Sequence, residues 1–313
     1  MKIVLLEGLG VSQQVIDAHA EKLARLGHTF AAFPKDADPQ VQLERSRDAN
    51  VVMLANMPLS PAVLEQATNL KFIDVAFTGV DHIPMELARS KGIAVSNASG
   101  YATQAVAELA VSFMIQLLRN VSQTEQRCRQ GGTKDGLVGC LLCGKTVGIV
   151  GAGAIGKKTA QLCKAFGCHV IAYNRSVVSA PSIDEQVTLD ELLDRADIVS
   201  LHCPLTPQTT GLIGEEQLAA MKPSAILINT ARGAVVDSAA LAAALNEGRI
   251  AGAASDVFEM EPPLPLDHPL LHCPNTIVTP HIAFASKESM EMRADIVFQN
   301  LYSWLEGKQL NPV

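Results

Sequence analysis

The sequence has no uninterrupted apolar stretch that approaches the length needed to span a bilayer, so we expect no membrane contact. It also lacks a run of lysines and arginines, and its net charge of −7 argues against a nucleic-acid partner. Aromatic residues are scarce at 4%, yet 48% of the 313 residues are hydrophobic, which is enough to bury a sizeable core. The N-terminal run MKIVLLEG contains an acidic residue, which is typical of a strand rather than a secretion signal. We therefore expect a globular, cytoplasmic protein.

The chain also lacks the cysteine pattern of a disulfide framework. Its seven cysteines are odd in number and scattered, which indicates reduced, buried thiols. Cys140 and Cys143 form a CxxC, but no second Cys/His pair stands at zinc-ligand spacing. A packing role for this pair is favoured over a redox or metal role, and we expect no metal site.

The order of apolar runs predicts two α/β domains. In the first 100 residues, short β-rich runs alternate with helix-length segments, which indicates βαβ units and a parallel sheet. Six further runs, TVGIV, HVIAY, ADIVSLH, AILINT, GAASDVF and TIVTP, predict a doubly wound parallel sheet. The helix expected at 287–306 has no strand beside it, so it should return to the first domain. We predict a smaller, flavodoxin-like, discontinuous substrate domain (1–100 plus 284–313) and a Rossmann-like dinucleotide-binding domain (101–283).

One predicted helix, at 102–119, is apolar on more than one face. A helix of this kind must be covered on all sides. We expect both domains or a second subunit to provide that cover.

Gly151, Gly153 and Gly156 form a GxGxxG motif between a predicted strand and a predicted helix. In that context the first glycine permits a tight turn, the second lets the backbone approach a pyrophosphate, and the third lets helix and strand pack closely. The amides and positive dipole of the helix N-terminus then bind phosphate. The motif predicts a dinucleotide cofactor.

The strand HVIAY should end beside the adenosine ribose, where NAD enzymes place a carboxylate. This sequence has Asn174, Arg175 and Ser176 there instead. A carboxylate would repel a 2′-phosphate, whereas a guanidinium can bind it through two charge-assisted hydrogen bonds. NADP(H) is therefore favoured over NAD(H), although Arg175 could also point to solvent while Asn174 binds an unphosphorylated ribose.

Arg232, Glu261 and His281 each follow a late strand of the predicted sheet. Ligands of such sheets bind at the carboxyl ends of the strands, so we expect the three to meet the reactive end of the cofactor. As hydride reaches a carbonyl carbon, a histidine can supply the proton that neutralises the oxygen. A carboxylate would orient that imidazole and stabilise its charged form, and an arginine would bind a substrate carboxylate and polarise the carbonyl. The three residues predict hydride transfer to a 2-oxo acid.

At this point the sequence resembles the D-isomer-specific 2-hydroxyacid dehydrogenase family over nearly its whole length. Several motifs in the family's order carry the resemblance: FTGVDHI (77–83), AVAELAV (105–111), GKTVGIVGAGAIG (144–156), LHCPLTPQTTGLI (201–213), INTARGAVVD (228–237), SDVFEMEP (255–262) and TPHIA (279–283).

The resemblance implies the same catalytic residues, Arg232, Glu261 and His281. It also implies that the backbone amides of Gly79 and Val80 help Arg232 and His281 bind the substrate, that Asp256 contacts the nicotinamide carboxamide, and that the helix at 102–119 contributes to a homodimer interface. The residues that we expect to contact the cofactor are Gly151, Gly153, Ala154, Ile155, Gly156, Asn174, Arg175, Ser176, His202, Cys203, Pro204, Thr209, Thr230, Ala231, Asp256, His281 and Ala283.

Three departures from the family pattern bear on these expectations. The missing carboxylate at Asn174 bears on the NAD preference, and Ala102 and Ser99 stand where the family usually has Asn and Pro. We expect the last two to affect the hinge or the substrate contacts and to leave the catalytic residues intact.

Two functions remain open. An oxidoreductase would use NAD(P)H on glyoxylate, hydroxypyruvate, pyruvate or a branched 2-oxo acid, and we expect the first domain, near 55–57 and Thr78, to select among them. The alternative is an NAD(H)-sensing, corepressor-like binding protein of the same fold. The chain begins on its first strand and ends soon after its last helix, which leaves little room for an added docking segment and favours the enzyme.

Overall fold

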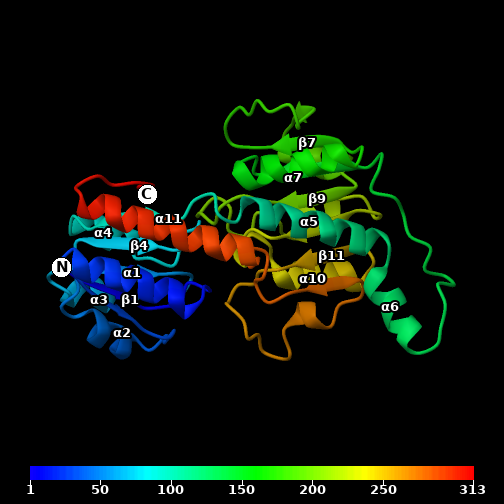
Figure 1. Ribbon diagram of the computed structural model, residues 1–313. Coiled ribbons are helices and arrows are strands. Elements are labelled where there is room, and N and C mark those ends of the chain that lie inside the picture. The colour runs from blue at the N-terminus through cyan, green and yellow to red at the C-terminus, as the bar shows by residue number, and fades with distance from the viewer. The chain divides into compact units, whose positions relative to one another are not determined.

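The computed structural model describes all 313 residues, which divide into two compact units. Unit 1 comprises Met1–Ala102 and Ala285–Val313, and unit 2 comprises Thr103–Phe284. Each unit contains one parallel sheet with helices packed around it (Figure 1). The expected α/β fold class is confirmed.

Unit 1 is built on a five-stranded sheet in the order β2-β1-β3-β4-β5, the flavodoxin-like order. β3 and β4 are buried at every position, as expected of parallel strands covered on both faces. Its elements are β1 (Lys2–Leu5), α1 (Gln13–Arg25), β2 (Thr29–Ala32), α2 (Pro39–Ser46), β3 (Val51–Leu54), α3 (Pro61–Gln66), β4 (Phe72–Val75), α4 (Met85–Ser90), β5 (Ala94–Asn97) and α11 (Lys287–Leu305).

The last helix, α11, completes unit 1 and makes it discontinuous in sequence. The helix lies along β4 (Figure 1), where Trp304 stacks on Phe72 with ring centroids 4.9 Å apart. Buried Asn300 donates hydrogen bonds to Asp74 on β4 and to the carbonyl of Asn97 on β5, both at 3.0 Å. These contacts anchor the end of the chain to strands that lie about 200 residues earlier in the sequence.

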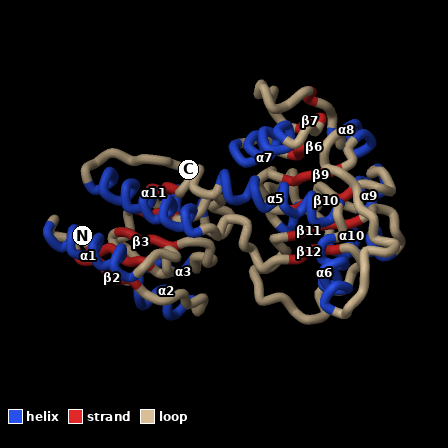
Figure 2. The backbone as a smooth tube through the Cα atoms, turned by 45° about the vertical axis from the view of Figure 1, so that its right-hand side comes forward, coloured by secondary structure: helices blue, strands red, loops and turns tan.

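Unit 2 is built on a seven-stranded sheet in the order β12-β11-β10-β9-β6-β7-β8. Helices lie on both faces of this sheet (Figure 2), as in other doubly wound folds. Its elements are α5 (Thr103–Leu118), α6 (Val121–Arg129), β6 (Thr146–Val150), α7 (Ala154–Ala165), β7 (His169–Tyr173), β8 (Glu185–Gln186), α8 (Leu189–Arg195), β9 (Ile198–Leu201), α9 (Glu215–Ala220), β10 (Ile226–Asn229), the 3-10 helix η1 (Gly233–Val235), α10 (Ser238–Asn246), β11 (Gly252–Ser255), the 3-10 helix η2 (Pro269–Leu271) and β12 (Thr276–Val278).

Two helices of unit 2, α8 and α10, begin at residues whose side chains cap them. The Thr188 side chain accepts a hydrogen bond from the amide of Glu191, and the Glu191 carboxylate accepts one from the amide of Thr188, so the two form a capping box at α8. Asp237 caps α10 by accepting from the amides of Ala239 and Ala240. These side chains satisfy amides that lack partners within the helix, so they fix where each helix starts.

Some elements lie outside the runs that the sequence analysis predicted. The strands β2 and β8 contain no fully buried residue, and β8 also lacks the apolar residues of the central strands. Helix α6 (Val121–Arg129) is polar, had not been predicted, and buries no residue. Apolar α5 packs on α7, β10, β11 and β12 within unit 2.

The expectation that the CxxC cysteines are packed is wrong. Cys140 and Cys143 are exposed, as is Cys128, while the other four cysteines are buried. The CxxC precedes β6 in a segment without regular structure, in which Leu142 between the two cysteines packs into the core while both thiols are exposed.

No single helix combines the length and the apolar composition that crossing a membrane requires. The α5–α6 pair, which bends by 63°, passes the same test only when its two helices are taken together.

Candidate active site

The GxGxxG turn connects β6 to α7. Gly151 has φ +95°, and a Cβ on it would lie 2.6 Å from the backbone nitrogen of Cys203, so only glycine fits there. A Cβ on Gly156 would lie 2.2 Å from the carbonyl oxygen of Gly151, so the helix could not start so close to the strand. The turn therefore has the geometry that the motif predicts.

The N-terminus of α7 is open where a pyrophosphate would bind. A Cβ on Gly153 would meet no atom within 4 Å, and no side chain caps the helix that starts at Ala154 and Ile155. The buried Oγ1 of Thr230, just after β10, has no hydrogen-bond partner in the chain. An open helix N-terminus and an unpartnered buried hydroxyl both fit a dinucleotide.

His202 and Cys203 support the glycine turn from the neighbouring strand β9. The amide of His202 donates to the carbonyl of Val150 at 2.8 Å, and burial lowers the pKa of His202 to about 4, so the ring is neutral at physiological pH. Burial raises the pKa of the Cys203 thiol. The backbone of these residues thus presses against Gly151, while the imidazole Nε2 lies 2.9 Å from Ser200 Oγ.

The turn after β9 is closed by Thr209. Its Oγ1 donates to the carbonyl of Pro204 at 2.7 Å and accepts from the amide of Thr206 at 2.8 Å. This places Pro204 and Thr209 on one compact turn at the carboxyl end of β9.

Asn174, Arg175 and Ser176 follow β7 directly. Asn174 Oδ1 accepts from the amide of Ala152 in the glycine turn at 3.1 Å, and its Nδ2 donates to the carbonyl and the hydroxyl of Ser176, each at 3.0 Å. Arg175 is exposed and has no ion-pair partner in the chain. The loop is therefore tied to the phosphate-binding turn and carries one unpaired cation.

Arg232 follows β10, and its backbone is held on both sides. Asn229 Nδ2 donates to the carbonyl of Arg232 at 3.0 Å, while Asn229 Oδ1 accepts from the amide of Ala231 at 3.0 Å. Gly233 lies so close to Phe258 that a Cβ would come within 1.8 Å of its carbonyl carbon. The sequence analysis missed the roles of Asn229 and Gly233, although both lie in the motif INTARG.

Asp256 follows β11 and organises the loop that carries His281. It is fully buried, and its Oδ1 accepts from Thr279 Oγ1 at 2.5 Å and from the amide of Ile282 at 2.8 Å. Its Oδ2 accepts from the amide of Ala283 at 2.7 Å. Burial raises the pKa of Asp256, and these hydrogen bonds partly oppose that rise. The nicotinamide contact expected of Asp256 stays a prediction.

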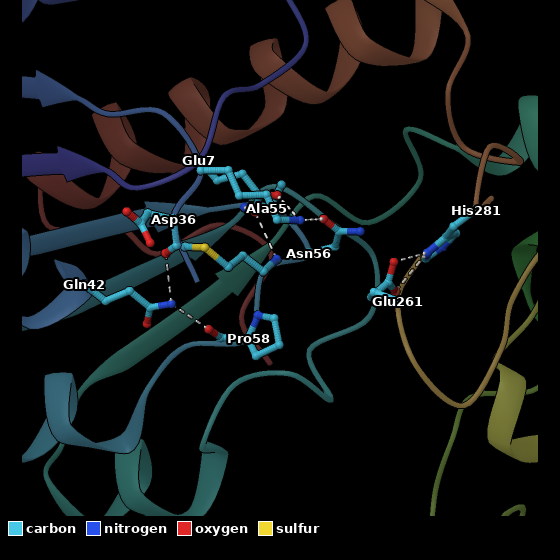
Figure 3. Close-up of polar contacts among 10 residues, drawn as sticks. Glu7, Asp36, Gln42, Ala55, Asn56, Pro58, Glu261 and His281 are labelled. Atoms are coloured by element: carbon cyan, nitrogen blue, oxygen red, sulfur yellow. Dashed lines mark hydrogen bonds and ion pairs between the residues drawn. The ribbon is translucent and has the colours of Figure 1, made fainter. Parts of the chain in front are cut away.

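His281 and Glu261 are in direct contact. His281 has φ +58°, a conformation that the Asp256 contacts maintain, and its Nδ1 lies 3.0 and 3.1 Å from the two carboxylate oxygens of Glu261 (Figure 3). The His281 side chain is 10% exposed, and that of Glu261 is 46% exposed. Phe284 packs edge-on against the imidazole at 5.2 Å. The imidazole is thus held by the Glu261 contact at Nδ1 and by the ring of Phe284.

Arg232, Glu261 and His281 follow β10, β11 and β12, which are consecutive neighbours in the sheet. All three therefore lie at its carboxyl edge, on loops that Asn229, Gly233 and Asp256 hold in place.

In unit 1, Gly79 and Val80 lie in the loop after β4. Asn97 Nδ2 donates to the carbonyl of Thr78 at 2.7 Å, and the amide of Ile83 donates to the carbonyl of Val80 at 3.0 Å. The amides of Gly79 and Val80 donate no hydrogen bond within the chain. Two unused amides on a fixed loop are suited to binding a carboxylate.

Glu7, which the sequence analysis did not assign to the site, supports the loop after β3. Its buried Oε2 accepts from the amides of Ala55 and Met57 at 3.0 and 2.9 Å, and Lys35 Nζ lies 3.0 Å from Oε1 (Figure 3). Buried Gln42 supports the next residues by donating to the carbonyl of Pro58 at 3.1 Å. The sequence signal for this role was the position of Glu7, an acidic residue at the end of the first apolar run.

Comparisons with known proteins agree with this geometry. The model of the family described as "D-isomer specific 2-hydroxyacid dehydrogenase, NAD binding domain" matches residues 111–283. The chain is 39% identical over 296 residues to the glycerate dehydrogenase of Methylorubrum extorquens, covering 91% of this chain and 92% of the relative. It is 34% identical to the hydroxypyruvate reductase of Blautia hydrogenotrophica, covering 100% and 99%.

A solved structure of an acyclic imino acid reductase in complex with NADPH and D-Arg matches with a TM-score of 0.92, at 29% identity and with full coverage of both chains. The family match and the relatives make the protein an oxidoreductase that uses a pyridine nucleotide to interconvert 2-oxo and 2-hydroxy acids. The chain belongs to the D-isomer specific 2-hydroxyacid dehydrogenase family.

Proposed function

We propose that the protein reduces a small 2-oxo acid, glyoxylate or hydroxypyruvate, to the D-2-hydroxy acid with NADPH in preference to NADH. The observation that carries the proposal is the contact of His281 Nδ1 with Glu261 at 3.0 Å, at the sheet edge that also holds Arg232. Relatives named glycerate dehydrogenase and hydroxypyruvate reductase support the substrate size.

In the proposed reaction, His281 donates a proton to the carbonyl oxygen from Nε2, because Nδ1 is engaged by Glu261. Glu261 holds the ring and stabilises its charged form until the proton leaves. Arg232 binds the substrate carboxylate and stabilises the negative charge that develops on the carbonyl oxygen. The bound cofactor supplies the hydride to the carbonyl carbon. One 2-oxo acid, one NADPH and one proton thus give one 2-hydroxy acid and one NADP+.

The cofactor preference rests on the loop after β7. Asn174 occupies the position where a carboxylate would repel a 2′-phosphate, and its side chain is used to tie Ala152 to Ser176. Arg175 is exposed and unpaired, so its guanidinium is available to a phosphate. Solved structural neighbours include complexes with NADPH and with NAD, so the loop's own residues carry the preference.

We propose that the amides of Gly79 and Val80 help to bind the substrate carboxylate. Their lack of partners within the chain supports this role. We also propose a homodimer, because the family resemblance implies that the helix at 102–119, here α5, contributes to a homodimer interface. Light scattering of the purified protein tests the dimer directly, and the cytoplasmic location stays a prediction.

The test of the reaction uses purified protein, a panel of 2-oxo acids, and NADPH or NADH in parallel. We expect Arg232→Ala to lower kcat/KM at least about 100-fold, the loss typical of removing one group that stabilises developing negative charge. Arg232→Lys, which keeps the charge without the planar fork, should fall between that variant and the wild type. NADPH binding should stay within about twofold of the wild type in both variants, because the cofactor's phosphates contact other residues.

Unchanged turnover in Arg232→Ala would refute the assigned role. A wild-type protein that binds NADPH but reduces no 2-oxo acid would instead favour a cofactor-sensing function.

A further inference from the structure

We propose that Gln186 is a positioning residue that holds the loop 174–178 in the shape that receives a 2′-phosphate, and so helps to set cofactor selectivity. The inference rests on the proposed NADPH preference. Gln186 lies on the two-residue strand β8, which the sequence analysis did not predict.

The side chain of Gln186 bonds to the loop at three points. Nε2 donates to the carbonyls of Asn174 at 3.2 Å and Ser176 at 3.0 Å, and Oε1 accepts from the amide of Val178 at 2.8 Å. Both amide hydrogens and the amide oxygen are therefore used on one loop. The loop has no regular secondary structure of its own. Beyond Tyr173, where the backbone hydrogen bonds of β7 end, the hydrogen bonds of a single side chain hold the loop.

Gln186 can act as a brace because its own backbone is fixed. It pairs with Ala172 of β7, and the amide of Val187 donates to the carbonyl of Ala172 at 2.9 Å. The amide of Asp184 donates to the carbonyl of Val170 at 2.8 Å. Gln186 thus lies on β8, which pairs with β7, and its side chain supports the loop that follows β7.

The opposite side of the loop is tied to the glycine turn. Asn174 Oδ1 accepts from the amide of Ala152, and Asn174 Nδ2 reaches Ser176. Arg175 therefore lies between two residues whose carbonyls Gln186 holds, while its own side chain has no partner. The position of the Arg175 side chain is therefore set by its backbone alone. By fixing that backbone, Gln186 preorganises the guanidinium to bind a phosphate.

Loss of the brace should weaken 2′-phosphorylated ligands selectively. A doubly hydrogen-bonded guanidinium–phosphate pair depends on geometry more than a single neutral hydrogen bond to a ribose hydroxyl does. Pyrophosphate binding at α7 does not involve Gln186, so it should persist without the brace.

The experiment compares wild type, Gln186→Met and Gln161→Met by calorimetry with adenosine 2′,5′-bisphosphate and with AMP. Methionine keeps the length of glutamine and loses its hydrogen bonds. Gln161 is an exposed glutamine on α7 that accepts from Lys158 and has no contact with the loop, which makes it the matched control. We expect Gln186→Met to raise the Kd for the bisphosphate about 10-fold, as preorganisation is lost, and to leave the Kd for AMP within about twofold.

In steady-state assays, the KM for NADPH should rise with the bisphosphate Kd while kcat at saturating NADPH stays unchanged. Equal weakening of both nucleotides, or an unchanged ratio of the two Kd values, would overturn the positioning role of Gln186 while leaving the NADPH preference intact. A wild-type protein that binds AMP as tightly as the bisphosphate would overturn the NADPH preference itself and, with it, this inference. Bound AMP in the variant shows that the unit is folded.

Discussion

Asp74 in unit 1 and Asp256 in unit 2 are both fully buried, yet the chain satisfies them to different degrees. Asp74 lies within β4 and accepts one hydrogen bond, from Asn300 Nδ2 to Oδ1, while its Oδ2 has no partner. Asp256 lies just beyond the end of β11 and accepts three hydrogen bonds from the loop of His281. The same side chain therefore has one partner inside a sheet and three at its carboxyl edge.

The difference follows from where each residue lies along its strand. Inside a parallel sheet the neighbouring amides are already committed to the ladder, so a carboxylate there must find side-chain donors. Beyond the strand end, the amides of a loop are free to turn toward it. A buried carboxylate at the edge thus shapes a functional loop, whereas one inside the sheet mainly links α11 to β4.

Both aspartates share the direction of their pKa shift. Burial raises the pKa of Asp74 well above its usual range, with the Asn300 hydrogen bond as a partial offset, and burial also raises the pKa of Asp256. A raised carboxyl pKa in the folded state means that the folded state holds its proton to higher pH than the unfolded chain. The contribution of the protonated carboxyl to the free energy of unfolding is therefore fully present below the pKa of the unfolded chain. It is lost as pH rises from that pKa through the higher pKa of the folded state.

Of the substitutions that test the difference between Asp74 and Asp256, Asp256→Asn should have the largest effect. Either orientation of the amide turns Nδ2 toward an N–H or O–H donor, so at least one of the three hydrogen bonds is lost. We expect kcat for 2-oxo acid reduction to fall about 100-fold, because a displacement near 1 Å at a reacting group has effects of that order. Steady-state kinetics measure this, with Asp74→Asn as the control that should keep the wild-type kcat.

A rise in the KM for the cofactor at unchanged kcat would contradict the positioning role. It would point instead to the nicotinamide contact that the family resemblance implies for Asp256.

Asp74→Asn tests the other half of the comparison through stability. An asparagine keeps an oxygen for Asn300 and cannot ionise, so the pH-dependent loss described above should disappear. As pH rises above the unfolded pKa, we expect the variant to gain stability relative to the wild type by about 1.4 kcal/mol per pH unit until the folded pKa is reached. Urea unfolding at several pH values measures it. A variant whose stability declines with pH as steeply as that of the wild type would exclude Asp74 as the source.

The sequence predicted the parts of this molecule that depend on local pattern. Apolar runs located the central strands, and GxGxxG located the turn after β6, because both are properties of neighbouring residues. The β-rich runs of the first 100 residues gave no partner for the aspartate of β4, since Asn300 is 226 residues away. The hydrogen bonds of Asp256 likewise join residues that lie 23 to 27 positions apart.

Strand β8 escaped prediction for a different reason. The two residues of β8 are polar and exposed, so no apolar pattern marks them, and Gln186 could be assigned a role only from its contacts. Side chains that act through hydrogen bonds across loops leave no periodic signal in a sequence.

The finest test of the comparison is Thr279→Val, which removes one donor from Asp256 and leaves both loop amides in place. The loop should keep its course, so we expect kcat to fall only about fivefold, which corresponds to roughly 1 kcal/mol, the value of one hydrogen bond. Thr279→Ser retains the hydroxyl and should match the wild type. If Thr279→Val lost as much activity as Asp256→Asn, the hydroxyl alone would be holding the His281 loop. The backbone amides would then be incidental, and Asp256, like Asp74, would depend on a single side-chain donor.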